Sequence, residues 1–389
     1  MTGLGRRTFV MGGLCAAACA GTAPLRAQPP ILYICPPCGC AADGRTFDQP
    51  GNCPACGMRL VPQDPAAAAA ALPFEPAALA PGAGAFTVRG GLGREDKRIV
   101  IHYYRPPGFT DRSPILLVIP GAGRDGDEYR DSWIAAADRH DLLVASPAYA
   151  EADYDFAAYH MGGTIRNLQL RNLPLGPDGQ LPASLYLRDE DIGFDPDPRP
   201  EAWLFNDFDR IFGLLVRATG SRRTRYDLFG HSAGAQILHR LVLFKPGTRA
   251  DRIVAANAGF YTLPDPATPQ PFGLAGTGIA AAALRAAFAS RLTLLLGALD
   301  NDPDRGGQHL HTPLADRQGL HRLARGRYFF EAGRREAARM RAPFRWRLQV
   351  VPGVGHDFRG MGQAAARLLY GGPIRELQPP SPMSTNGAQ

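Results

Sequence analysis

The sequence predicts an α/β domain, built on a mostly parallel sheet with helices on both faces and preceded by a small cysteine-rich module. From residue 86 onward, short apolar runs of strand length alternate with longer runs of helical periodicity. Strands separated by helices indicate a parallel sheet covered on both faces. All seven cysteines lie before residue 57, and a Pro- and Ala-rich stretch follows them. A chain of 389 residues accommodates one large and one small domain.

Composition and charge exclude several classes of protein. Hydrophobic residues make up 45% of the chain and charged residues 20%, which is typical of a globular protein and not of a disordered or membrane-spanning one. The formal net charge is +7, and only Lys97 and Lys245 of the 43 basic residues are lysines. The arginines are scattered along the chain, and no stacking aromatic residues interleave with them in a recognised module. We therefore expect no nucleic-acid partner.

Residues 1–27 have the features of a signal peptide for export. Arg6 and Arg7 precede Thr-Phe-Val, an apolar run follows, and Leu-Arg-Ala offers a small-residue cleavage site. The paired arginines resemble the twin-arginine signal of bacteria, which implies a periplasmic or secreted protein that is exported already folded. The apolar run is too short to cross a bilayer, so we expect no membrane span. A lipid on Cys19 is conceivable, but Ala16 stands where a lipoprotein signal normally has Leu.

Residues 28–62 contain two CxxC pairs, each followed by glycine. Cys35 and Cys38 form the first pair, and Cys53 and Cys56 form the second pair after 14 intervening residues. Two such pairs at this distance suit one tetrahedral zinc ion, because each turn directs two thiolates towards the same point. Four thiolates leave no open coordination position, so the sequence predicts a structural zinc site that takes no part in catalysis. A segment this short cannot bury a core of its own, and the metal would supply its folding energy.

Residues 33–62 resemble the heavy-metal-binding module of bacterial metal-efflux proteins. That module usually has a Cys-Pro-Met-His run, whereas this chain has Cys35, Cys38 and Cys40, which leaves open whether Cys40 replaces Cys38 as a ligand. The alternative is a pair of disulfides, which an oxidising periplasm favours. Five cysteines in the mature chain leave one unpaired in an all-disulfide scheme, and we therefore prefer zinc.

Two further segments lack the composition of a folded core. Residues 63–84 are rich in Pro, Ala and Gly and predict a linker with at most one short helix. Residues 374–389 are poor in apolar side chains and predict a disordered tail. The catalytic domain is accordingly expected over residues 85–373. Its strands are predicted at residues 98–104, 115–119, 142–146, 226–229, 253–257, 292–296 and 345–351, and two of its helices at residues 203–218 and 233–244.

A Gly-His-Ser-Ala-Gly motif at residues 230–234 follows one predicted strand directly and leads into an apolar helix. This strand–turn–helix setting is the one that a nucleophile elbow requires, with glycines where a Cβ atom would clash. It predicts Ser232 as a nucleophile. His231 is expected to pack beside the turn without a catalytic role.

A serine nucleophile needs a base, and the base needs an acid to orient it. His356 lies in a glycine-rich turn directly after the last predicted strand, which favours it over the other histidines. The order Ser, acid, His places the acid after the strand at residues 292–296. Asp300 is our first choice there, and Asp302 is the alternative.

The negative charge of a tetrahedral intermediate requires two backbone N–H donors. One is expected from Ala233, the residue after the nucleophile. The other is expected from Ala122, in a Gly-Ala-Gly turn that follows the strand at residues 115–119. A plain tight turn at residues 121–123 is the alternative interpretation.

Residues 86–372, with these three motifs in order, resemble the α/β-hydrolase family, and more narrowly its branch of secreted esterases and polyhydroxyalkanoate depolymerases. The resemblance implies hydrolysis of a small or polymeric ester through an acyl-enzyme, without a cofactor. It also implies a lid at residues 259–264 and 271–273. Four aromatic residues are candidates for an apolar acyl pocket or for ordinary core, namely Tyr129, Trp133, Tyr261 and Phe272. Alternatives to the esterase are a peptidase of the same fold and a metal-binding protein with a non-catalytic hydrolase scaffold.

Overall fold

The computed structural model describes residues 31–35, 40–42, 44–176, 181–182 and 184–371. The chain divides into two compact units, Met1–Ala71 and Leu72–Gln389. We call the described part of the first the metal module and that of the second the sheet unit. The expected export signal and C-terminal tail lie outside the described residues.

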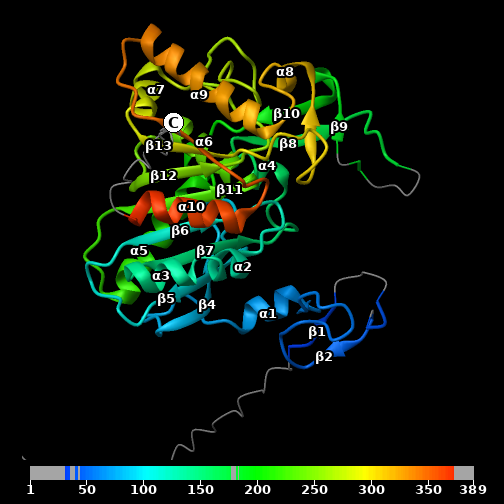
Figure 1. The fold of residues 1–389 in the computed structure, drawn as a ribbon, viewed down its shortest axis with the longest axis vertical. Helices are drawn as coiled ribbons and strands as arrows, with labels where there is room; N and C mark the ends of the chain where they lie inside the picture. Colours follow the sequence, from blue (N-terminus) through cyan, green and yellow to red (C-terminus); the bar gives the residue numbers. More distant parts are fainter. Residues whose placement is uncertain (1–30, 36–39, 43, 177–180, 183, 372–389) are drawn as a thin grey trace, which may run out of the picture. The chain divides into compact units, whose positions relative to one another are not determined.

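The metal module contains three very short strands and one helix (Figure 1). Strand β1 (Tyr33–Ile34) pairs antiparallel with both β2 (Thr46–Phe47) and β3 (Val61–Pro62). Helix α1 (Pro65–Ala71) follows. Four residues form its small buried cluster, namely Cys35, Ala42, Cys53 and Leu60. A core this small agrees with the expectation that a metal supplies much of the folding energy.

The sheet unit is built on an eight-stranded sheet with the order β15-β13-β12-β11-β6-β7-β5-β4. Its strands are β4 (Gly82–Arg89), β5 (Arg98–Arg105), β6 (Ile115–Ile119), β7 (Leu143–Tyr149), β11 (Tyr226–His231), β12 (Ala250–Ala256), β13 (Arg291–Gly297) and β15 (Arg347–Val351). The β4–β5 and β5–β7 pairs are antiparallel, and all the others are parallel. The parallel strands therefore end at one edge of the sheet, where ligands bind in folds of this class.

Helices lie on both faces of this sheet (Figure 1). They are α2 (Gly126–Asp131), α3 (Ile134–His140), α4 (Phe156–Tyr159), α5 (Phe205–Thr219), α6 (Ala233–Phe244), α7 (Ala281–Phe288), α8 (Pro313–Asp316), α9 (Arg322–Arg339) and α10 (Phe358–Tyr370), with 3-10 turns at Asp189–Asp191 and Pro200–Ala202. Helices α5, α6, α7 and α9 contribute to one buried cluster, and α2, α3 and α10 contribute to the other. The predicted fold class is confirmed.

Side-chain alternation along the strands explains the two cores. In β6, Ile115, Leu117 and Ile119 belong to the first cluster. Leu116 and Val118, between them, belong to the second. Successive residues of a strand point to opposite faces, so a strand buried on both sides is apolar throughout. The unbroken apolar run of this strand in the sequence is the signature of that burial.

The segment predicted as a linker, residues 63–84, is one only in part. Gln63 still belongs to the metal module, because its N–H donates to the carbonyl of Leu32. Leu79 is buried in the core of the sheet unit, and β4 begins at Gly82. Strand β4 was not predicted because its first half is rich in Ala and Gly. It forms because its backbone pairs with that of β5 over eight residues. A composition-based prediction does not detect such pairing.

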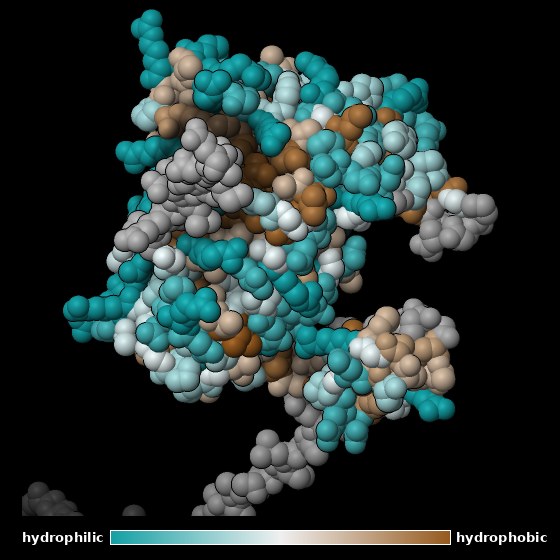
Figure 2. All heavy atoms as spheres, in the orientation of Figure 1, coloured by the Kyte–Doolittle hydropathy of each residue, from teal (hydrophilic) through white to brown (hydrophobic). Residues whose placement is uncertain are grey.

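Short strands at the carboxyl edge of the sheet were also missed. β8 (Ile165–Leu170) pairs with β10 (Ile192–Pro196), and β9 (Ser184–Tyr186) pairs with β14 (His309–His311). Much of the surface in Figure 2 is hydrophilic, with scattered apolar patches. Within the described ranges, no helix combines the length and apolar character needed to cross a bilayer.

Candidate active site and metal centre

Ser232 lies in the turn between β11 and α6, where the sequence predicted a nucleophile. Its backbone has a positive φ of 57° with a ψ of −115°. A non-glycine residue rarely adopts such angles, and they persist only where the surrounding structure imposes them. The neighbouring elements do so here, since the Ser232 N–H donates to the carbonyl of Ala256 at 2.9 Å.

Two glycines allow the strand and helix to approach each other at this turn. A Cβ atom on Gly230 would lie 2.6 Å from the backbone carbon of Gly234. A Cβ atom on Gly234 would lie 2.2 Å from the carbonyl oxygen of Ile119, in the neighbouring strand β6. Both distances are far below van der Waals contact. The two glycines of the motif are therefore required by close packing around Ser232.

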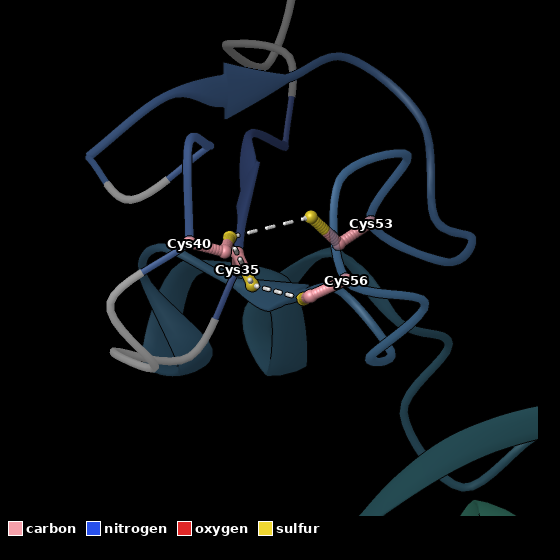
Figure 3. A group of neighbouring side chains, drawn as sticks. All are labelled: Cys35, Cys40, Cys53 and Cys56. Carbon is pink, nitrogen blue, oxygen red and sulfur yellow. Dashed lines mark hydrogen bonds between the residues drawn. The ribbon is translucent and has the colours of Figure 1, made fainter.

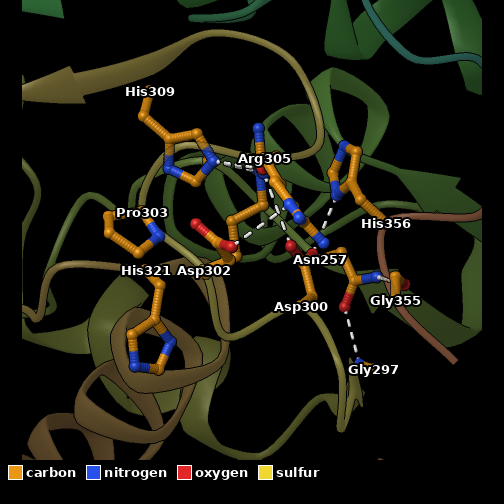
Figure 4. Close-up of polar contacts among 12 residues, drawn as sticks. Asn257, Gly297, Asp300, Asp302, Pro303, Arg305, His309, His321, Gly355 and His356 are labelled. Carbon is orange, nitrogen blue, oxygen red and sulfur yellow. Dashed lines mark hydrogen bonds and ion pairs between the residues drawn. The ribbon is translucent and has the colours of Figure 1, made fainter. Parts of the chain in front are cut away.

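His356 and Asp300 form a direct hydrogen bond in the loops after β15 and β13. The Nδ1 of His356 lies 2.8 Å from Oδ2 of Asp300 (Figure 4). Asp302, the alternative acid, is directed elsewhere: its side chain is 41% exposed and pairs with Arg305 at 3.4 Å. Of the two carboxylates proposed from the sequence, the structure thus brings Asp300 to the imidazole.

Burial makes His356 a weaker base than an exposed histidine. Its side chain is 13% exposed, and burial is the main cause of a pKa below the usual value. The hydrogen bond to Asp300 acts in the opposite direction, and the charge of Arg322 lowers the pKa further. The net shift is downward, so the neutral imidazole that a general base requires is favoured to a lower pH than in water.

Asn257 connects the two loops that carry this pair, and it was not among the residues predicted from the sequence. Its side-chain N–H donates to the carbonyl of Gly355 at 3.0 Å, and its Oδ1 accepts from the N–H of Gly297 at 2.8 Å (Figure 4). Gly297 ends β13, and Gly355 directly precedes His356. Asn257 itself follows β12 with φ 54°, a conformation that asparagine tolerates better than most residues. Its position after a strand, at the edge where the motifs gather, was the available signal.

The two expected oxyanion donors lie beside Ser232. A Cβ atom on Gly121 would be 3.5 Å from the Cβ of Ser232, so the turn at residues 121–123 touches the nucleophile. Ala122 and Ala233 both line the cavity that Ser232 faces. Ala233 is the first residue of α6, and the first N–H groups of a helix have no acceptor within the helix.

His231 packs beside the elbow as expected. It is fully buried, and its Nδ1 lies 3.3 Å from the hydroxyl of Tyr129. Burial, followed by the charges of His356 and Arg322, holds its pKa well below the usual value. The imidazole of His231 is therefore neutral, and its ring centroid lies 4.5 Å from that of His356.

Ser232 and His356 face a cavity of about 580 Å³. Much of its wall is apolar and comes from the insertion between β7 and α5, through Met161, Ile165, Leu168, Leu170, Leu185 and Ile192. Among the described residues that line it, the formally charged ones besides histidine are Asp125 and Arg322. This volume and lining suit an uncharged, largely apolar ligand.

The wall differs from the one expected from the sequence. Of the four candidate aromatic residues, Tyr129 lines the cavity. Trp133, Tyr261 and Phe272 are instead buried in the core clusters. Of the expected lid segments, Gly259, Phe260 and Pro271 reach the cavity. The leucines and isoleucines of the insertion gave no clear signal, because their strands pair with each other and with a distant segment after β13.

The metal module brings together the sulfur atoms of Cys35, Cys40, Cys53 and Cys56 (Figure 3). The Sγ–Sγ distances are 3.5 Å for Cys35–Cys56 and 3.9 Å for Cys35–Cys40 and Cys40–Cys53. Tetrahedral Zn–S bonds of about 2.3 Å place sulfurs ~3.8 Å apart, so the cluster fits such an ion. None of these four is in a disulfide.

The described cluster shares Cys35, Cys53 and Cys56 with the ligand set predicted from the sequence. That set contained Cys38, which lies outside the described residues, whereas the described cluster contains Cys40. Spacing alone favoured Cys38, because a CxxC pair is the usual unit. The Sγ of Cys40 lies 3.9 Å from that of Cys53, which favours the alternative that the sequence left open, with Cys40 as a ligand.

The sheet and the serine elbow define the class of α/β-hydrolases, and the chain belongs to this family. Two solved structures are similar to it over most of their length. Poly(aspartic acid) hydrolase-1 from Sphingomonas sp. KT-1 is 38% identical, with 75% of this chain and 100% of that chain covered and a TM-score of 0.64. LpqC, a poly(3-hydroxybutyrate) depolymerase from Bordetella parapertussis, is 32% identical, with 77% and 92% covered and a TM-score of 0.65.

The metal module has a family match of its own. A family model described as a heavy metal binding domain matches residues 32–63. No curated protein matches the chain. The protein is therefore a hydrolase that carries a heavy-metal-binding module with a four-cysteine cluster.

Proposed function

We propose that the protein is an exported serine hydrolase that cleaves carboxylic esters through an acyl-enzyme. Ser232 is the nucleophile, His356 its general base and Asp300 the acid that orients His356. The observation that carries the proposal is the strained turn at Ser232, which faces the same cavity as a histidine hydrogen-bonded to a buried carboxylate. An arrangement of this kind activates a hydroxyl that is otherwise scarcely nucleophilic at neutral pH.

The hydrogen bond between His356 and Asp300 determines how the proton moves. Because Nδ1–H donates to the carboxylate, the lone pair of the neutral imidazole lies on Nε2. Nε2 takes the Ser232 proton as the hydroxyl oxygen attacks the ester carbonyl, and returns it to the leaving alcohol. Water then repeats the sequence on the acyl-enzyme. The N–H groups of Ala122 and Ala233 stabilise the oxyanion formed in each step.

The cavity favours an uncharged ester with an apolar acyl or alcohol part. Its wall is rich in leucine and isoleucine, and Arg322, its one described Lys or Arg, is already paired with Asp300. A polyanionic substrate would lack a free cation there. A polyester such as the substrate in the name of LpqC agrees better with this lining.

Replacing Ser232 by alanine tests the proposal. We expect turnover of a short-chain aryl ester and labelling by a fluorophosphonate to fall by at least about 10⁴-fold, because a mutant without the nucleophile keeps only binding and the oxyanion donors. Ser146→Ala is the matched control, since this serine is buried in β7 away from the cavity. Equal activity of the Ser232→Ala and wild-type proteins would refute the assignment.

Amide hydrolysis is the second candidate, because the more identical relative is a poly(aspartic acid) hydrolase. The two candidates share the nucleophile and differ in the leaving group and in substrate charge. Poly(aspartic acid), poly(3-hydroxybutyrate) and matched aryl esters and anilides, compared at equal concentration, distinguish them. We expect the polyester and aryl esters to be cleaved at least about 10-fold faster, given the missing cation.

We further propose that the four-cysteine cluster holds a structural zinc ion and that the twin-arginine pathway exports the folded, loaded protein. The cluster fits a tetrahedral thiolate site. Four ligands leave no position for a substrate or water, so the ion would stabilise the module and take no part in ester hydrolysis. Export of a protein that is already folded preserves a metal site filled in the cytoplasm.

A further inference from the structure

We propose that Arg322 is a positioning residue for the Asp300–His356 pair: its guanidinium fixes the orientation of the Asp300 carboxylate, and its positive charge favours the neutral form of His356. The inference rests on the proposed function and deepens it. No motif around Arg322 distinguishes it from the other arginines of this chain.

The contacts of Asp300 lead to Arg322. Asp300 has two carboxylate oxygens, and Oδ2 accepts the hydrogen bond from His356. The Nη1 of Arg322 lies 3.4 Å from the other oxygen, Oδ1, and both side chains are almost fully buried. The start of α9 is also fixed to the same residue, because the N–H of Leu323 donates to the backbone carbonyl of Asp300 at 3.0 Å. Each carboxylate oxygen thus has its own partner.

The guanidinium is itself held in place from the other side. It donates to the carbonyl of Arg305 at 3.1 Å and to that of Gln308 at 3.2 Å. Its Nη1 also lies 2.6 Å from Nε2 of His309, which is labelled in Figure 4. Burial, followed by the Arg322 charge, lowers the pKa of His309 to about 4, so this imidazole is neutral and adds no second positive charge beside Arg322. Arg322 is therefore a fixed cation.

The effect of Arg322 on the protonation of His356 depends on the other groups around this imidazole. His356 faces Asp300 from the loop after β13, Arg322 from α9, the adjacent Asp357, and the neutral His231 from β11. Arg322 is the second partner of the buried Asp300 carboxylate. Its positive charge also opposes a second positive charge on His356. Removing Arg322 takes away a positive charge that opposes protonation of His356, so the pKa of His356 should rise.

Arg322 would make the same contacts if it only stabilised the loop at residues 303–309. The pH dependence of kcat/KM distinguishes this structural role from an effect on His356. Arg325, one turn further along α9, is the matched control. It is fully buried and donates to the carbonyls of Gly319, Gly259 and Leu310. Its carboxylate partner is Asp316. Arg325→Gln therefore removes a buried arginine of the same helix without altering the charge beside Asp300.

The measurements are the pH profile of kcat/KM and an NMR titration of the His356 imidazole in wild type, Arg322→Gln, Arg322→Lys and Arg325→Gln. We expect the wild-type acid limb below the usual histidine value of about 6.5. In Arg322→Gln it should rise by roughly one pH unit and kcat should fall about 10–100-fold. The acid limb of Arg322→Lys should lie closer to that of wild type. Arg325→Gln should lose thermal stability, but its acid limb should stay at the wild-type pH.

An acid limb and titration of Arg322→Gln that match those of wild type would overturn the proposal, as would an equal shift in Arg325→Gln. The titration needs no turnover, so it tests Arg322 even where Ser232→Ala disproves the esterase. If Arg322→Gln does not fold, Asp300→Asn is compared with the double variant Asp300→Asn/Arg322→Gln. Neither variant has an unpaired buried carboxylate, so both are expected to fold. The proposal requires His356 to titrate at higher pH in the double variant, and equal values would contradict it.

Discussion

Replacing Asn257 by alanine removes the link between the acid loop and the histidine loop. The N–H of Gly297, in a buried strand, would lose its acceptor, at a cost of about 1–3 kcal/mol. The partly exposed carbonyl of Gly355 would lose a donor that water can partly replace, costing about 0.5–1.5 kcal/mol. Alanine at φ 54° adds strain of about 1–2 kcal/mol. We expect a loss of about 3–6 kcal/mol in the free energy of unfolding.

Thermal unfolding and steady-state kinetics measure this effect. A loss of that size lowers Tm on the order of 10 °C for a domain of this size, and kcat should fall about 10-fold or more because Asp300 and His356 are no longer fixed relative to each other. Asn257→Gly, which removes the strain but not the lost contacts, should recover about 1 kcal/mol. Asn167→Ala is a control at a similar φ of 53°, whose side-chain hydrogen bond is exposed. If the Tm and kcat of Asn257→Ala equal those of Asn167→Ala, the prediction is refuted.

Two further predictions concern the acid and the metal. Asp300→Asn should lower kcat of ester hydrolysis by about 10³–10⁴-fold, because an amide stabilises the wrong imidazole tautomer, while Asp302→Asn should change it less than about 3-fold; similar losses in both variants would contradict the assignment. Zinc analysis of the purified chain should give one ion per molecule in Cys38→Ser and a marked loss in Cys40→Ser, with esterase activity unchanged by either substitution. If Cys38→Ser loses zinc and Cys40→Ser keeps it, Cys38 is a ligand and Cys40 is not.

The metal module and the sheet unit are distinct units of the chain, each with its own chemistry. The four-cysteine cluster has a ligand set suited to a closed structural site. The proposed triad requires no metal, because His356 and Asp300 supply the base and its orientation. Chelation is therefore expected to affect the stability of the module and not the rate of ester hydrolysis.

Several features could be predicted from the sequence because neighbouring residues encode them. The apolar runs of the central strands and the helices between them indicated the parallel sheet. The turn at Ser232 was detectable because its glycines lie within two residues of the serine, where close packing of one strand and one helix requires them. His356 could be proposed because its glycine-rich turn directly follows the last strand of the sheet.

Other features depend on how segments that are distant in the sequence pack together. The choice of Asp300 over Asp302 depends on which carboxylate the loop after β13 turns towards His356. Asn257 and Arg322 gain their importance from contacts with loops up to about a hundred residues away. Local spacing constrains which residues can share a turn or a helix face, but it does not determine which distant group a buried polar side chain contacts. The partners of a buried polar group are fixed by the tertiary fold, because only there does the cost of leaving that group unpaired arise.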